Sequence, residues 1–120
     1  MRVWCSREDR TRRDRRVRSR RHLGRDGGTQ PRRLLVLGAG AVGLELVQAF
    51  VRLGTEVDVV DIAPAFLPHE DPEIAKVMRN ILESEGIRFH LGAKTLRVKR
   101  IDSGIELIVW DDAGERAVAC

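Results

Sequence analysis

Three glycines are the residues of this chain whose spacing most directly suggests chemistry. Gly38, Gly40 and Gly43 follow the pattern G-x-G-x-x-G, directly after the apolar residues 34–37 and at the start of an apolar helical segment. Gly38 permits a tight turn after a strand, and Gly40, which has no Cβ, lets a pyrophosphate approach the backbone. Gly43 lets the helix pack closely on the strand. The pattern predicts a dinucleotide site with the phosphates on the free N–H groups of the helix start.

An acidic residue stands where such a site needs one. Asp61 ends a second apolar run, residues 57–60, and follows Gly43 by 18 residues. An acid at this distance contacts the ribose hydroxyls of the adenosine. Because it repels a 2′-phosphate, NAD is favoured over NADP. The structural alternative is that the glycines only form a tight turn.

The elements that position these residues follow from apolar spacing. We expect a helix at about 41–53, ended by Gly54, with Glu45 in its first turn. Glu45 there is either an acid favoured by the helix dipole or a residue that points beyond the phosphates. Asp71 and Pro72 are a good N-cap and first residue for a second helix, which ends at Gly86.

The spacing of that second helix and of the residues after it completes the fold prediction. Apolar residues at 74, 77, 78, 81 and 82 predict one buried helix face. A third strand at 87–91 then gives a Rossmann-like β-α-β-α-β unit with a parallel sheet. From position 94 the apolar period becomes two, which predicts an antiparallel three-stranded meander at 94–101, 105–110 and 116–120.

The charge is divided unevenly along the chain. Residues 1–33 carry 13 Arg and 4 acids, a net charge of +9, against −5 for residues 34–120. Residues 1–32 are therefore expected to be a basic, disordered arm, and residues 33–120 the domain. Nucleic-acid binding by the arm is a weaker possibility, because the arm lacks regular stacking residues. Acidic residues argue against a transit peptide, and no apolar stretch is long enough to span a membrane, so a cytoplasmic location is expected.

Cysteine and histidine add no catalytic pattern. Cys5 and Cys120 lie at opposite ends of the chain, which gives neither a disulfide framework nor metal spacing. His22, His69 and His90 are scattered, and each is interpreted as a surface or half-buried residue. No metal site is expected.

Taken together, five segments and the meander resemble one family. The segments are GAGAVGLE (38–45), RLGTEVDVVD (52–61), LPHEDPEI (67–74), LESEGI (82–87) and LGA (91–93). They are similar to the NAD(P)-binding domain of the FAD-dependent pyridine nucleotide-disulfide oxidoreductases, and most like its dihydrolipoyl dehydrogenase branch. The acid Asp61 fits that NAD-using branch, and so does the small Ala41, where some relatives carry tyrosine.

The resemblance implies roles for particular residues. The three glycines would hold the pyrophosphate, Asp61 the ribose hydroxyls, and Glu45 would lie by the nicotinamide. Lys94 would border the adenine through its backbone. The complete set of expected cofactor-binding residues is Gly38, Ala39, Gly40, Ala41, Val42, Gly43, Glu45, Asp61 and Lys94. In the complete family enzyme, a homodimer, reducing equivalents pass between NADH and a disulfide through FAD and a cysteine pair.

The chain also departs from the family pattern. The family places an FAD domain with a C-x-x-x-x-C pair before this domain, and a further parallel strand and a dimerisation domain after it. The sequence therefore predicts a fragment or a frame-disrupted product that is truncated before the last parallel strand and does not catalyse alone. Residues 34–37 would form an exposed apolar edge, and stability would be marginal. The alternatives are a free-standing NAD-binding module and, less favoured, a nucleic-acid binder.

Overall fold

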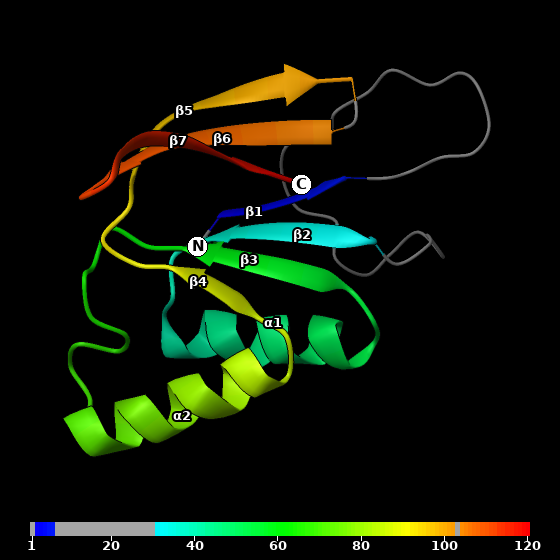
Figure 1. Ribbon diagram of the computed structural model, residues 1–120. Helices are drawn as coiled ribbons and strands as arrows, with labels where there is room; N and C mark the ends of the chain where they lie inside the picture. Colours follow the sequence, from blue (N-terminus) through cyan, green and yellow to red (C-terminus); the bar gives the residue numbers. More distant parts are fainter. Residues whose placement is uncertain (1, 7–30, 103) are drawn as a thin grey trace.

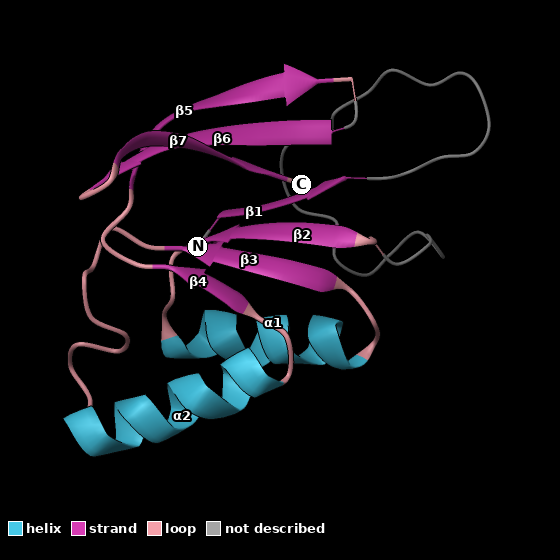
Figure 2. Cartoon of the chain, viewed as in Figure 1, coloured by secondary structure: helices cyan, strands magenta, loops and turns pink. Residues whose placement is uncertain are grey.

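The structure is a computed structural model of the chain and describes residues 2–6, 31–102 and 104–120. The described residues form two sheets and two helices, whose arrangement is shown in Figures 1 and 2. In chain order the elements are β1 (Arg2–Ser6), β2 (Arg33–Leu37), α1 (Ala41–Arg52), β3 (Glu56–Val60), α2 (Pro72–Ser84), β4 (Arg88–His90), β5 (Lys94–Ile101), β6 (Gly104–Asp111) and β7 (Gly114–Ala119). The predicted α/β fold, a parallel β-α-β-α-β unit followed by an antiparallel meander, is confirmed.

The parallel strands β2, β3 and β4 lie side by side, and the antiparallel sheet has the order β5-β6-β7. Figure 1 shows both helices on one face of the parallel sheet and the antiparallel sheet on the other. A parallel sheet covered on both faces requires strands that are apolar at consecutive positions. This explains why residues 34–37 and 57–60 are nearly continuous apolar runs.

Alternate residues of each parallel strand contribute to two separate cores. Leu34 and Val36 on β2 pack with Val57 and Val59 on β3 beneath the helices. Leu35, between them, packs on the other face against Leu107, Val109 and Val118 of the antiparallel sheet. The period of two in a strand therefore fixes the order of the layers, from helices through parallel sheet to meander.

The edge of β2 is not exposed, and here the sequence prediction was wrong. β1 pairs antiparallel with β2 over its whole length, from Arg2 opposite Leu37 to Ser6 opposite Arg33. The expectation of a disordered arm therefore fails for residues 2–6, whereas residues 7–30 lie outside the described part of the chain. The physical reason is that an apolar edge strand offers unpaired N–H and C=O groups, which a short extended segment can satisfy.

The two helices begin as predicted. α1 starts directly after Gly40, and α2 has Pro72 as its first residue with Asp71 as N-cap. The Asp71 carboxylate accepts a hydrogen bond from the backbone N–H of Glu73 at 2.9 Å, which satisfies a donor that lacks an intrahelical partner. At the other end of α2, Glu85 accepts hydrogen bonds from Gln48 and Arg52 of α1, each at 3.1 Å.

The buried face of α2 differs from the predicted one. Ala75 and Leu82 are the buried residues of this helix. Ile74, Val77 and Ile81 are 55%, 57% and 49% exposed, and Met78 is 37% exposed. The apolar period correctly indicated a helix. Only Ala75 and Leu82 of this helix are buried in the described fold, and the rest of its apolar stripe is exposed. No helix in the described ranges is long and apolar enough to cross a membrane.

Candidate dinucleotide site at the carboxyl edge of the parallel sheet

The glycine turn lies where β2 ends and α1 begins. Gly38 has a φ of 99°, a left-handed conformation that favours glycine, and its N–H donates to the Val60 carbonyl at 2.8 Å. Gly40 is the N-cap residue of α1, with extended backbone angles and no side-chain cap. The first N–H groups of a helix have no intrahelical partner, so this turn presents backbone donors and the positive end of the helix dipole. Gly43 is buried, as close packing of the helix on the strand requires.

Asp61 follows β3 and lies beside that turn. Its Oδ2 accepts a hydrogen bond from the Ala39 N–H at 2.7 Å, and its Oδ1 accepts one from the Ala63 N–H at 2.9 Å. The carboxyl ends of neighbouring parallel strands meet at one edge of the sheet, which is where open α/β sheets bind ligands. The structure thus brings together the glycine turn and the acid that the sequence had paired.

Two further predicted residues, Lys94 and Glu45, are both exposed and belong to β5 and α1. Lys94 is exposed at the start of β5, and the N–H of its neighbour Ala93 donates to the Asp61 carbonyl at 3.0 Å. Glu45 is exposed on α1 but does not lie in its first turn, which contains no acid. The interpretation of Glu45 as a first-turn acid was therefore wrong, because the helix begins at Ala41 and Glu45 falls in the second turn.

The cofactor-binding roles stay predictions, because contacts within the protein do not test them. Ala39 is buried, while Ala41 is exposed at the first position of α1. Val42 is the next residue of that helix. The three lie in or directly after the glycine turn, as the pattern requires. Among the described residues, no group of three or more His, Cys, Asp or Glu could hold a metal ion.

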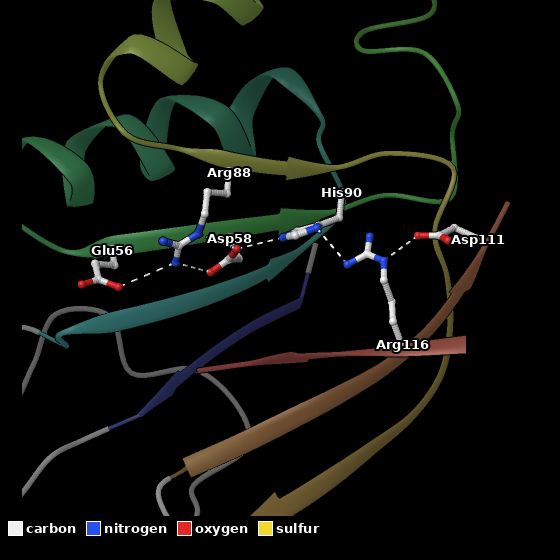
Figure 3. Close-up of polar contacts among 6 residues, drawn as sticks. All are labelled: Glu56, Asp58, Arg88, His90, Asp111 and Arg116. Atoms are coloured by element: carbon white, nitrogen blue, oxygen red, sulfur yellow. Dashed lines mark hydrogen bonds and ion pairs between the residues drawn. The ribbon is translucent and has the colours of Figure 1, made fainter. Parts of the chain in front are cut away.

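A polar network crosses from the parallel sheet to the meander (Figure 3). Asp58 of β3, which is 6% exposed, accepts two hydrogen bonds from the Arg88 guanidinium, at 2.9 and 2.7 Å. His90 Nε2 lies 2.8 Å from Asp58 Oδ1, and His90 Nδ1 lies 3.2 Å from a guanidinium nitrogen of Arg116. Arg116 also donates to Asp111 at 2.6 Å. A neutral imidazole protonated on Nε2 satisfies both of its neighbours.

Hydrogen bonds within the network shift the pKa values of three of its members, Asp58, Arg88 and Asp111. Burial by itself would raise the pKa of Asp58, but hydrogen bonds from Arg88 and His90 outweigh it and lower that pKa to about 2. The hydrogen bond between Arg88 and Asp58 in turn raises the pKa of Arg88. At the other end, the hydrogen bond from Arg116 lowers the pKa of Asp111. The network therefore holds ionised carboxylates at neutral pH, and it links β3 and β4 to β6 and β7.

Sequence reasoning missed this network and had interpreted His90 only as a surface or half-buried residue. His90 is half-buried, but its partners come from strands distant in the sequence. One signal was available: Asp58 interrupts the apolar run 57–60, and a carboxylate within a buried strand needs charged or hydrogen-bonding partners. That signal predicts partners without saying which residues supply them.

Comparisons with known proteins agree with this geometry. Residues 33–112 match the family model for pyridine nucleotide-disulphide oxidoreductase. A dihydrolipoyl dehydrogenase of Thermus scotoductus is 42% identical over 79 residues, which is 66% of this chain and 17% of the relative. The mitochondrial dihydrolipoyl dehydrogenase of Pisum sativum is 39% identical over 84 residues, which is 70% of this chain and 17% of the relative.

A solved structure extends the likeness to three dimensions. The crystal structure of LpdA from Mycobacterium tuberculosis superposes with a TM-score of 0.63 at 32% identity, covering 75% of this chain and 19% of that one. The chain therefore spans about a fifth of the length of the proteins that it matches. Because the family model covers residues 33–112, which include the glycine turn, Asp61 and the start of the meander, this chain belongs to the pyridine nucleotide-disulphide oxidoreductase family.

Proposed function

We propose that this chain is the NAD(H)-binding portion of an FAD-dependent disulfide oxidoreductase, most like dihydrolipoyl dehydrogenase. Family membership and relatives named dihydrolipoyl dehydrogenase support the reaction class. NAD supplies hydride-transfer chemistry in such an enzyme. FAD and a redox-active cysteine pair belong to the complete family enzyme, a homodimer, so the chain alone binds cofactor without turnover.

The observation that carries the proposal is the empty space at Gly40. Its φ is −68°, which any residue can adopt, and a Cβ built on it meets no atom within 4 Å. The folded chain therefore has no need of its own for a glycine at this position. A ligand that approaches the backbone does need one, and a pyrophosphate on the first turn of α1 is such a ligand.

Asp61, Glu45 and Lys94 are proposed to contact the other parts of the dinucleotide. The carboxylate of Asp61 lies next to the turn, and each of its oxygens keeps acceptor capacity for a ribose hydroxyl beyond the backbone N–H that it already binds. Its negative charge disfavours a 2′-phosphate, so the chain selects NAD over NADP. Glu45 and the backbone of Lys94 are proposed to border the nicotinamide and the adenine, respectively.

The proposal is tested by comparing the NADH affinity and the stability of two glycine variants, one at the site and one far from it. In Gly40→Ala, the new methyl meets no protein atom, so the free energy of unfolding changes by less than about 1 kcal/mol, while NADH affinity falls at least about tenfold through the clash with the phosphates. Gly114→Ala is the matched control, because a Cβ on Gly114 also meets no atom within 4 Å but this residue begins β7, outside the proposed site. Its φ of 100° is one that alanine rarely adopts. This variant loses about 1 kcal/mol of stability and keeps its NADH affinity.

The measurement is titration of each purified chain with NADH, followed by nicotinamide fluorescence, together with denaturant unfolding. An unmodified chain that binds no NADH would contradict the proposal. So would a Gly40→Ala variant with unchanged affinity, since the phosphates would then lie elsewhere. NADPH in place of NADH is the third titration, and the unmodified chain is expected to bind it more weakly.

A further inference from the structure

Asp61 connects three separate segments of the chain through all of its polar groups. Its carboxylate binds the N–H groups of Ala39, at 2.7 Å, and Ala63, at 2.9 Å. Its own N–H donates to the His90 carbonyl and its carbonyl accepts from the Ala93 N–H, both at 3.0 Å. The residue thus joins the glycine turn, the loop after β3 and the connection from β4 to β5.

The main-chain and side-chain contacts of Asp61 have different requirements. Any residue other than proline at this position could make the two main-chain bonds, because they depend only on the path of the backbone. The two side-chain bonds require two oxygen acceptors facing two backbone donors. A carboxylate supplies both, and its charge strengthens each bond.

The bond to Ala39 fixes the part of the site with the greatest conformational freedom. Ala39 stands between Gly38 and Gly40, and glycines lose more backbone entropy on ordering than any other residue. Ala39 is only 6% exposed, so an N–H left without this carboxylate would lack an acceptor in a largely buried place. The Asp61 side chain therefore supplies an acceptor in the middle of the turn.

We propose that Asp61 is a positioning residue that holds the glycine turn in its binding conformation before any dinucleotide arrives. This inference rests on the proposed function, and it adds a second role to the contact of Asp61 with the ribose. Both roles are compatible, because each carboxylate oxygen accepts one N–H in the free protein and retains a further lone pair. Ordering the turn in advance reduces the entropy that binding must overcome.

Hydrogen exchange of the ligand-free chain tests the inference without relying on cofactor binding. In Asp61→Ala, both carboxylate oxygens are removed, so the Ala39 and Ala63 N–H groups both lose their side-chain acceptor. We expect the Ala39 amide to exchange about tenfold faster or more, while amides of the β2–β3 ladder keep their protection. Asp71→Ala is the matched control, since Asp71 also accepts backbone N–H bonds but at the start of α2. Its Ala39 amide should exchange at the unmodified rate.

An Ala39 amide that exchanges at the unmodified rate in Asp61→Ala overturns the inference, because the turn would then be held by its own backbone. Should this variant lose protection throughout the sheet, Asp61→Glu replaces it. The longer side chain displaces the carboxylate, so faster exchange at Ala39 is expected and an unchanged rate overturns the inference. NADH titration of the same samples separates the two proposals. If the unmodified chain binds no NADH while Asp61→Ala still accelerates exchange at Ala39, the proposed function fails and the positioning role stands.

Discussion

Acid should weaken this fold through Asp58 in a defined range of pH. Asp58 is nearly inaccessible and is hydrogen-bonded to Arg88 and His90, which lower its pKa from its usual 3.8 to about 2. A carboxyl with a depressed pKa in the folded state stabilises that state at any pH above its unfolded pKa. The stabilisation is lost as the pH falls from about 4 towards 2, where the folded protein must also take up the proton. At about 1.4 kcal/mol per pKa unit, the loss is about 2 kcal/mol.

The assay is urea unfolding, followed by circular dichroism, at closely spaced pH values from 7 down to the acid limit of the fold. Asp111 and Glu85 also have lowered pKa values, so the unmodified chain alone does not isolate Asp58. The difference between the unmodified chain and Asp58→Asn does, because both contain the other acids. Above pH 4 the variant should be less stable by at least about 2 kcal/mol, since it also leaves Arg88 and His90 without their carboxylate.

The diagnostic result is the change of that difference with pH. It should shrink steadily below pH 4 as Asp58 of the unmodified chain becomes protonated. A difference that stays constant from neutral pH to about pH 2.5 would refute the reasoning, since Asp58 would then have the same pKa in the folded and unfolded chain.

Further predictions concern the core between the two sheets, the exposed apolar stripe of α2 and the edge of β2. Leu107→Ala removes a fully buried side chain from the interface between the sheets, so denaturant unfolding should show a loss of about 2–5 kcal/mol. Val77, in the apolar stripe of α2, is 57% exposed. Val77→Ser should therefore lower the free energy of unfolding by less than about 1 kcal/mol in the same assay. A loss as large as that of Leu107→Ala would instead place Val77 in the core. Deleting residues 2–6 removes β1 from the edge of β2, and light scattering should then detect association that grows with concentration. A deletion variant that stays monomeric would show that the edge is protected in another way.

Local patterns in the sequence were enough to predict most elements of the fold. The glycine spacing, the N-cap Asp71 with Pro72, and the change of apolar period at position 94 each depend on neighbouring residues alone. They located the two helices, the three parallel strands and the meander within a few residues of their observed bounds. The spacing of 18 residues between Gly43 and Asp61 also assigned both to one dinucleotide site. In the structure they meet because parallel strands carry their carboxyl ends to the same edge.

The tertiary structure decided what depends on residues far apart in the sequence. An apolar stripe shows that α2 is a helix, but which side is buried depends on the shape of the sheet beneath it, so Ile74 and Val77 lie exposed. The pairing of β1 with β2 joins segments separated by more than 20 residues, and arm composition carries no information about register. The partners of Asp58, Arg88 and His90, lie on β4, about 30 residues further along the chain, so local sequence patterns did not identify them either. The sequence by itself determined the elements and the dinucleotide pattern, since both are local, whereas contacts between elements depend on how these pack.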